Sequence, residues 1–98
     1  MPAAAPGFER EPGWRLHPQV ALRPEPFGAL LYHFGTRKLS FLKNPTIVGI
    51  VQSLPEHETV ADAIDAAGIE ERSRHLYVHA LATLAQSDML VRSEQAAA

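Results

Sequence analysis

The sequence predicts an α+β domain in which a three-stranded antiparallel β-meander precedes three α-helices. Residues 19–43 are rich in bulky and aromatic side chains that favour pleated strands, and prolines and Gly35 interrupt them. Beyond this region apolar residues recur at helical spacing, and Asn44 and Thr59 are typical N-capping residues. A hairpin beside two short helices and one longer helix is the inventory of a winged helix-turn-helix domain.

Length and composition exclude several classes of protein. A chain of 98 residues fits one domain with one modest core. The net charge of −2 gives no bulk attraction to nucleic acid or to an anionic membrane. The absence of cysteine excludes a disulfide scaffold, a thiol nucleophile and a zinc finger. We see no membrane-spanning run and no signal peptide, so we expect a cytoplasmic protein.

The predicted domain runs from residue 14 to residue 91. Residues 1–13 contain three prolines and two glycines, which predicts a disordered N-terminal tail. Trp14 is the first residue expected to anchor the fold. Residues 92–98 are expected to fray as a C-terminal tail.

Three strands are expected in order along the chain. Gln19–Arg23 alternates between apolar and more exposed positions, and its flanking prolines make it a short edge strand. Phe27–Phe34 is apolar on both faces, as expected of a central strand. A turn at Gly35–Thr36 leads to Arg37–Lys43, the third strand, whose far side has no partner in the meander.

Three helices are expected after the strands. Asn44 as N-cap with Pro45 at the first helical position starts the first helix, and Pro55 ends it. Thr59 caps the second helix, which ends at Gly68. The third helix is predicted from about Glu70 to about Gln86, with a polar stripe made of Arg72, His75, His79, Thr83 and Gln86. Residues 89–91 are long enough for a turn or a short strand.

Candidate chemistry in the chain favours a binding module over an enzyme. His75 and His79 stand at i and i+4, a spacing that can bind a divalent ion, but no acidic residue lies beside them at ligand spacing. A solvated polar face is the preferred interpretation, so no metal site is predicted. Nucleophile-elbow, phosphate-loop and dinucleotide motifs are absent, and we predict no catalytic residue and no cofactor.

A winged-helix DNA-binding regulator is the first alternative for such a module. The third helix opens with Glu70 and Glu71, whose charges offset Arg72 and Arg74. Together with the negative net charge, this predicts weak affinity for DNA, so nucleic acid is not the expected partner.

Peptide binding fits the residues better. The third strand presents an edge with a basic rim, to which an extended peptide can add through main-chain hydrogen bonds. Five basic residues on the strand and on the third helix would favour acidic residues on that peptide: Arg37, Lys38, Lys43, Arg72 and Arg74. From the residues alone, an edge protected by lysine is an equally good interpretation, and self-pairing of the edge into a homodimer also stays open.

The N-terminal half of the chain carries a family resemblance. Residues 14–44, and above all Arg-Pro-Glu-Pro-Phe-Gly-Ala-Leu-Leu-Tyr-His-Phe at 23–34, resemble the mycofactocin biosynthesis peptide chaperones. These are small relatives of the pyrroloquinoline-quinone chaperone (PqqD-like), within the recognition elements for ribosomally made, post-translationally modified peptides. The resemblance extends to Leu90, although the helical half matches only as an apolar pattern.

The resemblance implies a non-catalytic peptide chaperone without a cofactor of its own. Such a protein binds the leader of a precursor peptide as an added strand against the third helix. It then presents the peptide to a radical S-adenosylmethionine (SAM) maturase, which carries the iron–sulfur clusters. The peptide-binding residues implied by the matching strand and helix face are Arg37, Lys38, Leu39, Ser40, Phe41, Leu42, Lys43, Arg72, His75 and His79.

Overall fold

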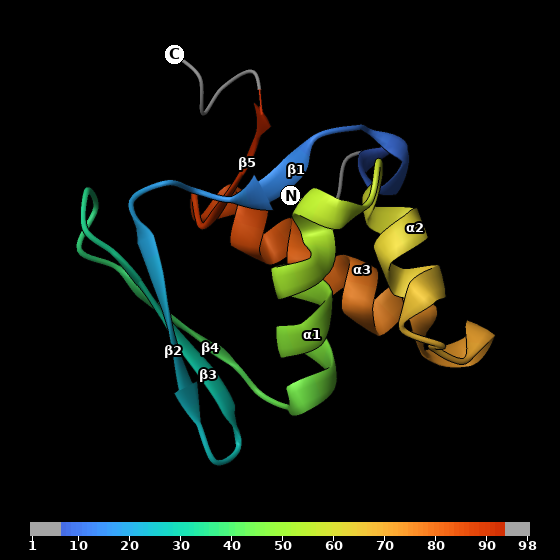
Figure 1. The fold of residues 1–98 in the computed structure, drawn as a ribbon, viewed down its shortest axis with the longest axis horizontal. Coiled ribbons are helices and arrows are strands. Elements are labelled where there is room, and N and C mark those ends of the chain that lie inside the picture. Colours follow the sequence, from blue (N-terminus) through green and yellow to red (C-terminus); the bar gives the residue numbers. More distant parts are fainter. Residues whose placement is uncertain (1–6, 94–98) are drawn as a thin grey trace.

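The fold places a three-stranded sheet on one side of the molecule and the helices on the other, with a second, two-stranded sheet across the top (Figure 1). The structure is a computed structural model, and it describes residues 7–93. The elements are η1 (Phe8–Arg10, a 3₁₀ helix), β1 (Trp14–Leu16), β2 (Val20–Glu25), β3 (Gly28–His33), β4 (Leu39–Leu42), α1 (Pro45–Ser53), η2 (Leu54–Glu56, a 3₁₀ helix), α2 (Val60–Ala66), α3 (Glu71–Gln86) and β5 (Leu90–Arg92).

The predicted meander is confirmed, with the strand order β2–β3–β4 and antiparallel pairing throughout. Alternate residues of the central strand, among them Ala29 and Leu31, are buried against the helices. Strand β2 runs on to Glu25, beyond its predicted end, because Pro24 lies on an edge strand where a missing N–H is tolerated. Only Pro26 and Phe27 then connect β2 to β3.

The turn between β3 and β4 is longer than predicted and is organised by His33. The imidazole Nδ1 of His33 accepts hydrogen bonds from the backbone N–H groups of Gly35 (3.0 Å) and Thr36 (3.1 Å). Arg37 adopts a left-handed conformation with φ of 65°, and its N–H donates to the His33 carbonyl (2.7 Å). Arg37 and Lys38 therefore belong to the turn, and β4 begins only at Leu39.

The helix starts agree with the capping residues in the sequence. Asn44 Oδ1 accepts from the N–H of Ile47 at 2.9 Å, and Thr59 Oγ1 accepts from the N–H of Asp62 at 3.1 Å. Gly68 follows α2 with φ of 74°, the left-handed conformation expected after a helix end. Helix α3 starts at Glu71 and ends at Gln86, as the periodicity predicts.

The predictions of a disordered N-terminal tail and a frayed C-terminal tail are partly wrong, because both ends of the described chain are folded. Phe8 is buried and its ring centroid lies 5.1 Å from that of Trp14, so the predicted disorder does not hold for residues 7–13. Strand β1 pairs with β5, with Trp14 opposite Arg92, and the N–H of Ser93 donates to Gly13 at 2.7 Å. Arg92 and Ser93 are therefore not frayed. The rest of the two predicted tails, residues 1–6 and 94–98, lies outside the described residues.

One hydrophobic core joins the sheet to the helices. Helix α1 packs against β3, and α3 packs against both α2 and β5. The largest fully buried side chains come from every layer: Leu31, Ile50, Val51, Leu54, Val60, Ile64, Leu81, Met89 and Leu90. Burial of this apolar surface is the main force that holds the sheet on the helices.

Candidate functional site

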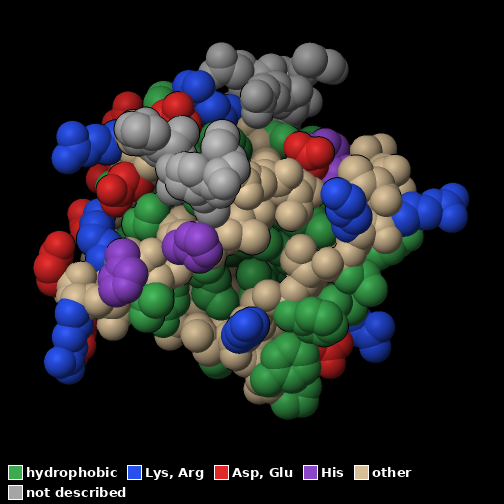
Figure 2. All heavy atoms as spheres, turned by 180° about the vertical axis from the view of Figure 1, so that it is seen from behind, with side chains coloured by type: hydrophobic (Ala, Val, Ile, Leu, Met, Phe, Trp, Pro, Cys, Tyr) green, Lys and Arg blue, Asp and Glu red, His purple; other side chains and the backbone are tan. Residues whose placement is uncertain are grey.

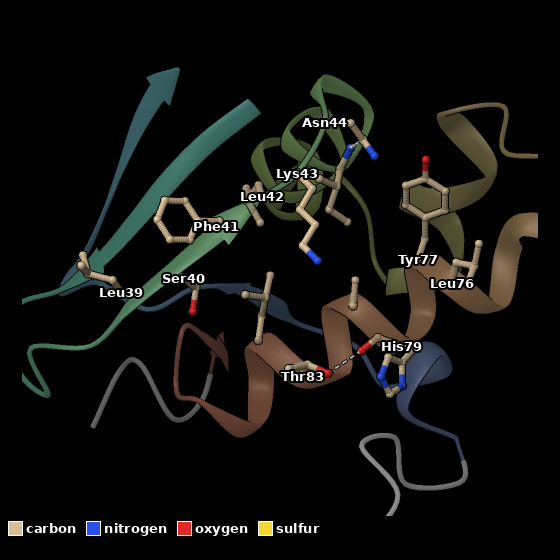
Figure 3. A pocket seen from close by; sticks show the side chains of 13 residues that line it. Leu39, Ser40, Phe41, Leu42, Lys43, Asn44, Leu76, Tyr77, His79 and Thr83 are labelled. Carbon is tan, nitrogen blue, oxygen red and sulfur yellow. Dashed lines mark hydrogen bonds between the residues drawn. The ribbon is translucent and has the colours of Figure 1, made fainter. Parts of the chain in front are cut away.

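A groove of about 590 Å³ lies between strand β4 and helix α3. Figure 3 shows it from close by, with β4 along one wall and α3 along the other. Its walls are mostly apolar. The residues that line it are Leu39, Ser40, Phe41, Leu42, Lys43, Asn44, Ile47, Leu76, Tyr77, His79, Ala80, Thr83 and Leu84.

Strand β4 has a partner on one side only, within the described residues 7–93. His33 N–H donates to Lys38 at 3.0 Å, and hydrogen-bonded pairs alternate along an antiparallel ladder. In the register of β3 and β4, the backbone N–H and C=O groups of Ser40 and Leu42 are therefore hydrogen-bonded to β3. The same alternation directs the N–H and C=O groups of Leu39 and Phe41 toward the open edge. That edge borders the groove.

The side chains of β4 divide between two faces of the sheet. Leu42 is buried in the core, and Ser40 and Lys43 point toward α3 (Figure 3). Leu39 and Phe41 point away from α3, onto the face of the sheet that no helix covers (Figure 3). The groove thus has an apolar floor with one ammonium group extending into it.

The wall on α3 is more apolar than the sequence predicts. Leu76, Ala80 and Leu84 follow one another at helical spacing and line the groove. Leu76 is 60% exposed, which is unusual for a leucine on a helix face that borders other elements. Of the predicted polar stripe, His79 and Thr83 reach the groove, and the Thr83 hydroxyl donates to the His79 carbonyl at 3.0 Å.

Four of the predicted site residues do not line the groove. Arg37 and Lys38 lie in the turn before β4. Arg72 pairs with Glu70 at 3.0 Å and is largely exposed. His75 lines a separate hollow on the other flank of α3, together with Glu71. The other six predicted residues, Leu39, Ser40, Phe41, Leu42, Lys43 and His79, line the groove.

Of the groove residues on α3, sequence reasoning found only His79, because it assigned the polar stripe of the helix to the site. The signal was present in Leu76, which lies beside the apolar stripe that the sequence predicts for the core, made of Tyr77, Ala80, Leu81 and Leu84. An apolar residue beside the core stripe widens the apolar face of a helix toward a neighbouring element. Here that neighbour is the edge strand β4.

Arg74 joins three elements near the start of α3. It donates a hydrogen bond to the Asp65 carboxylate on α2, and its Nε lies 3.6 Å from Glu9 on η1. The hydrogen bond to Asp65 is the main cause that raises the pKa of Arg74. Since Arg72 is also paired, both arginines that a DNA-binding helix would use at this position bind carboxylates of the protein itself.

A metal at His75 and His79 finds no third ligand in the described part of the chain. Within residues 7–93 no three His, Asp or Glu side chains are grouped so that they could hold an ion. In the same residues no helix has the length and apolar character needed to cross a bilayer.

Comparison with known proteins places this chain in a family. The model of the peptide chaperone MftB family matches residues 13–91, which include all of the groove. The chain belongs to the peptide chaperone MftB family. The resemblance to mycofactocin biosynthesis chaperones is therefore confirmed.

Relatives within the MftB family share much of the sequence. The chain is 60% identical to the peptide chaperone MftB of Mycobacterium ulcerans over 94% of its own length and 84% of that protein. It is also 60% identical to those of Mycobacterium tuberculosis and Mycolicibacterium smegmatis, over 86% of the chain and 77% and 82% of the relatives. No solved structure matches the chain.

Proposed function

We propose that this protein is a non-catalytic peptide chaperone of mycofactocin biosynthesis. It binds the leader of a ribosomal precursor peptide and presents it to a radical SAM maturase. Membership of the MftB family supports the chaperone role. The observation that carries the binding mode is the open edge of β4 directly beside the apolar groove on α3.

A peptide strand added to β4 would use both the open edge of β4 and the apolar groove beside α3. Its main chain would bond to the outward N–H and C=O groups of Leu39 and Phe41. Its side chains would alternate, so that every second one enters the groove between β4 and α3. Apolar side chains at these positions would contact Leu76, Ala80 and Leu84.

Charge favours an acidic peptide over a second copy of the chain. Arg37, Lys38 and Lys43 surround β4, and no acidic residue lies between residues 26 and 55. An antiparallel two-fold pairing centred on Ser40 would set Lys43 of one copy against Arg37 of the other. Like charges opposite one another destabilise a strand pair, whereas carboxylates on a peptide would stabilise it.

Proline at Phe41 tests strand addition directly. The N–H of Phe41 points to the open edge, so Phe41→Pro removes a donor that the folded domain does not use, and edge strands tolerate proline. We expect the leader of the precursor peptide to bind at least about tenfold more weakly in calorimetry. Proline at Ser40 is unsuitable, because the N–H of Ser40 bonds to β3.

Phe41→Thr is the matched control. It removes the same ring and keeps the N–H group, and threonine suits a strand. The proposal requires the threonine variant to bind several-fold more tightly than the proline variant. Equal affinities in two folded variants would mean that the peptide does not pair with β4.

A further inference from the structure

The face of the sheet opposite the helices carries an apolar patch, of which only Leu39 and Phe41 also border the groove. We call it the outer face and define it by Phe27, Leu30, Tyr32, Phe34, Leu39 and Phe41. Phe34 is 62% exposed and packs edge-on against Tyr32, with ring centroids 4.9 Å apart. Phe27 and Phe41 are 49% and 60% exposed, and their centroids lie 6.3 Å apart. Figure 2 shows hydrophobic side chains gathered at its lower right, over the end of the β2–β3 hairpin.

The size of the outer face fits a transient partner better than a stable dimer. Since a large aromatic side chain can bury about 150–250 Å², the three half-exposed phenylalanines offer roughly 300 Å², and the half-exposed Leu39 brings the patch to roughly 400 Å². A patch of this size on a monomer is often functional. A stable interface needs about 800 Å² on each partner, about twice as much.

The charges around the outer face indicate the chemistry of that partner. Strands β2 to β4 and the turns between them carry Arg23, Arg37 and Lys38 against the single acid Glu25, while Lys43 after β4 points into the groove. The Arg23 side chain is 77% exposed, even though it pairs with Glu25 at 3.2 Å. A complementary surface is apolar at its centre and acidic at its rim.

The outer face is continuous with the edge on which the peptide would lie. A strand added to β4 extends the sheet, and half of its side chains then lie on the outer face beside Leu39 and Phe41. A protein docked on this face would therefore contact the chaperone and the bound peptide together.

We propose that the outer face is the docking surface for the maturase that modifies the peptide. This inference rests on the proposed function. It gives the two surfaces separate roles, with the groove holding the leader and the outer face holding the enzyme. Because the added strand completes the docking surface, each ligand increases the affinity for the other by the same factor.

The test measures two affinities for each variant by biolayer interferometry, one for the precursor peptide and one for the purified maturase. Phe27→Ser with Phe34→Thr removes two rings of the outer face that do not line the groove. We expect the maturase to bind this variant at least about tenfold more weakly, and the peptide to bind within about twofold of the unchanged protein.

Leu76→Gln is the matched control in the groove, and we expect it to weaken peptide binding and leave maturase binding in the absence of peptide unchanged. Phe34→Thr alone repeats the test with a smaller change, should the double variant be unfolded by circular dichroism. Unchanged maturase binding in a folded variant overturns the inference, and so does a loss of peptide affinity of equal size. A homodimer in sedimentation that the variants dissociate also overturns it. A failure of the unchanged protein to bind the peptide would instead refute the proposed function.

Discussion

At the scale of single residues, Gly28 allows β4 to approach β3 closely. A Cβ atom at this position would lie 2.0 Å from the Leu42 carbonyl oxygen and 3.0 Å from the Asn44 nitrogen. Both are backbone atoms, which cannot move aside without shifting β4. Glycine at the start of β3 is therefore a requirement of the β3–β4 pairing and of the groove wall that follows.

Gly28→Ala is expected to destabilise the protein by about 1–3 kcal/mol, because the methyl group overpacks the strand pair. Thermal unfolding followed by circular dichroism measures the change. Gly49→Ala in α1 is the control, since nothing lies within 4 Å of its Cβ position. Alanine there should stabilise the helix by about 0.5–1 kcal/mol. Equal effects of the two substitutions would contradict the steric argument.

His33 acts as a buried acceptor in the turn that precedes β4. It is 3% exposed, it accepts two backbone N–H groups, and its ring centroid lies 4.4 Å from that of His17. His33→Ala leaves both donors without this acceptor and is expected to lower the free energy of unfolding by about 2–3 kcal/mol. His33→Asn, whose side-chain oxygen can accept in the same turn, should restore part of this stability in urea denaturation. If asparagine is no better than alanine, the hydrogen bonds do not carry the effect.

At the scale of elements, Arg74 fixes the start of α3 relative to α2 and η1. Its partners are Asp65, Glu9 and the Ala61 carbonyl, which Nη2 approaches at 3.5 Å. Arg74→Met keeps the apolar stem and should lower the free energy of unfolding by about 0.5–1 kcal/mol, a small value because Asp65 is largely exposed. A raised pKa means that the arginine contributes fully below its ordinary value and loses that contribution only in strong alkali. The difference in the free energy of unfolding between the unchanged protein and Arg74→Met should therefore be the same at pH 6 and at pH 8. A difference that changes between these pH values would contradict this account.

Elements that depend on neighbouring residues were predicted well from the sequence. Asn44 and Thr59 cap α1 and α2, because a side-chain acceptor needs only the next turn of its own helix. The pairing of β1 with β5 was not predicted from the sequence, because Trp14 and Arg92 lie far apart in the chain and each strand has only three residues. Long-range pairing of such short segments leaves no periodic signal.

The same contrast holds for the candidate site. Its strand half was predicted, because a meander necessarily leaves β4 with an open edge. Its helix half was predicted only at His79, because the rotation of α3 about its axis depends on packing that no local pattern reveals. The apolar wall from Leu76 to Leu84 is therefore a result of the structure.

At the scale of the whole molecule, the three-stranded sheet is basic and the segment from η2 to the start of α3 is acidic. Strands β2 to β4 with their turns carry four cations and one acid, whereas residues 54–71 carry Glu56, Glu58, Asp62, Asp65, Glu70 and Glu71 and no cation. The net charge of −2 hides this separation. A ligand with acidic residues is attracted to the sheet and repelled from the far helices, so that it approaches in the correct orientation.

This separation predicts that association with an acidic leader peptide slows as salt is added. Between about 50 mM and about 500 mM salt we expect the association rate to fall several-fold, because the Debye length shortens. The dissociation rate should change less. Stopped-flow fluorescence measures both rates, and Lys43→Gln should reduce the salt dependence. An association rate independent of salt would contradict electrostatic steering.

The pairing of β1 with β5 has a consequence for engineering. Gly13 and Ser93 are joined by a backbone hydrogen bond, and the chain before Gly13 is also folded, with Phe8 buried against Trp14. Neither β1 nor β5 lines the groove. A fusion of this domain to another protein should therefore keep residues 7–13, because a cut at Gly13 would remove the Phe8 ring from the core.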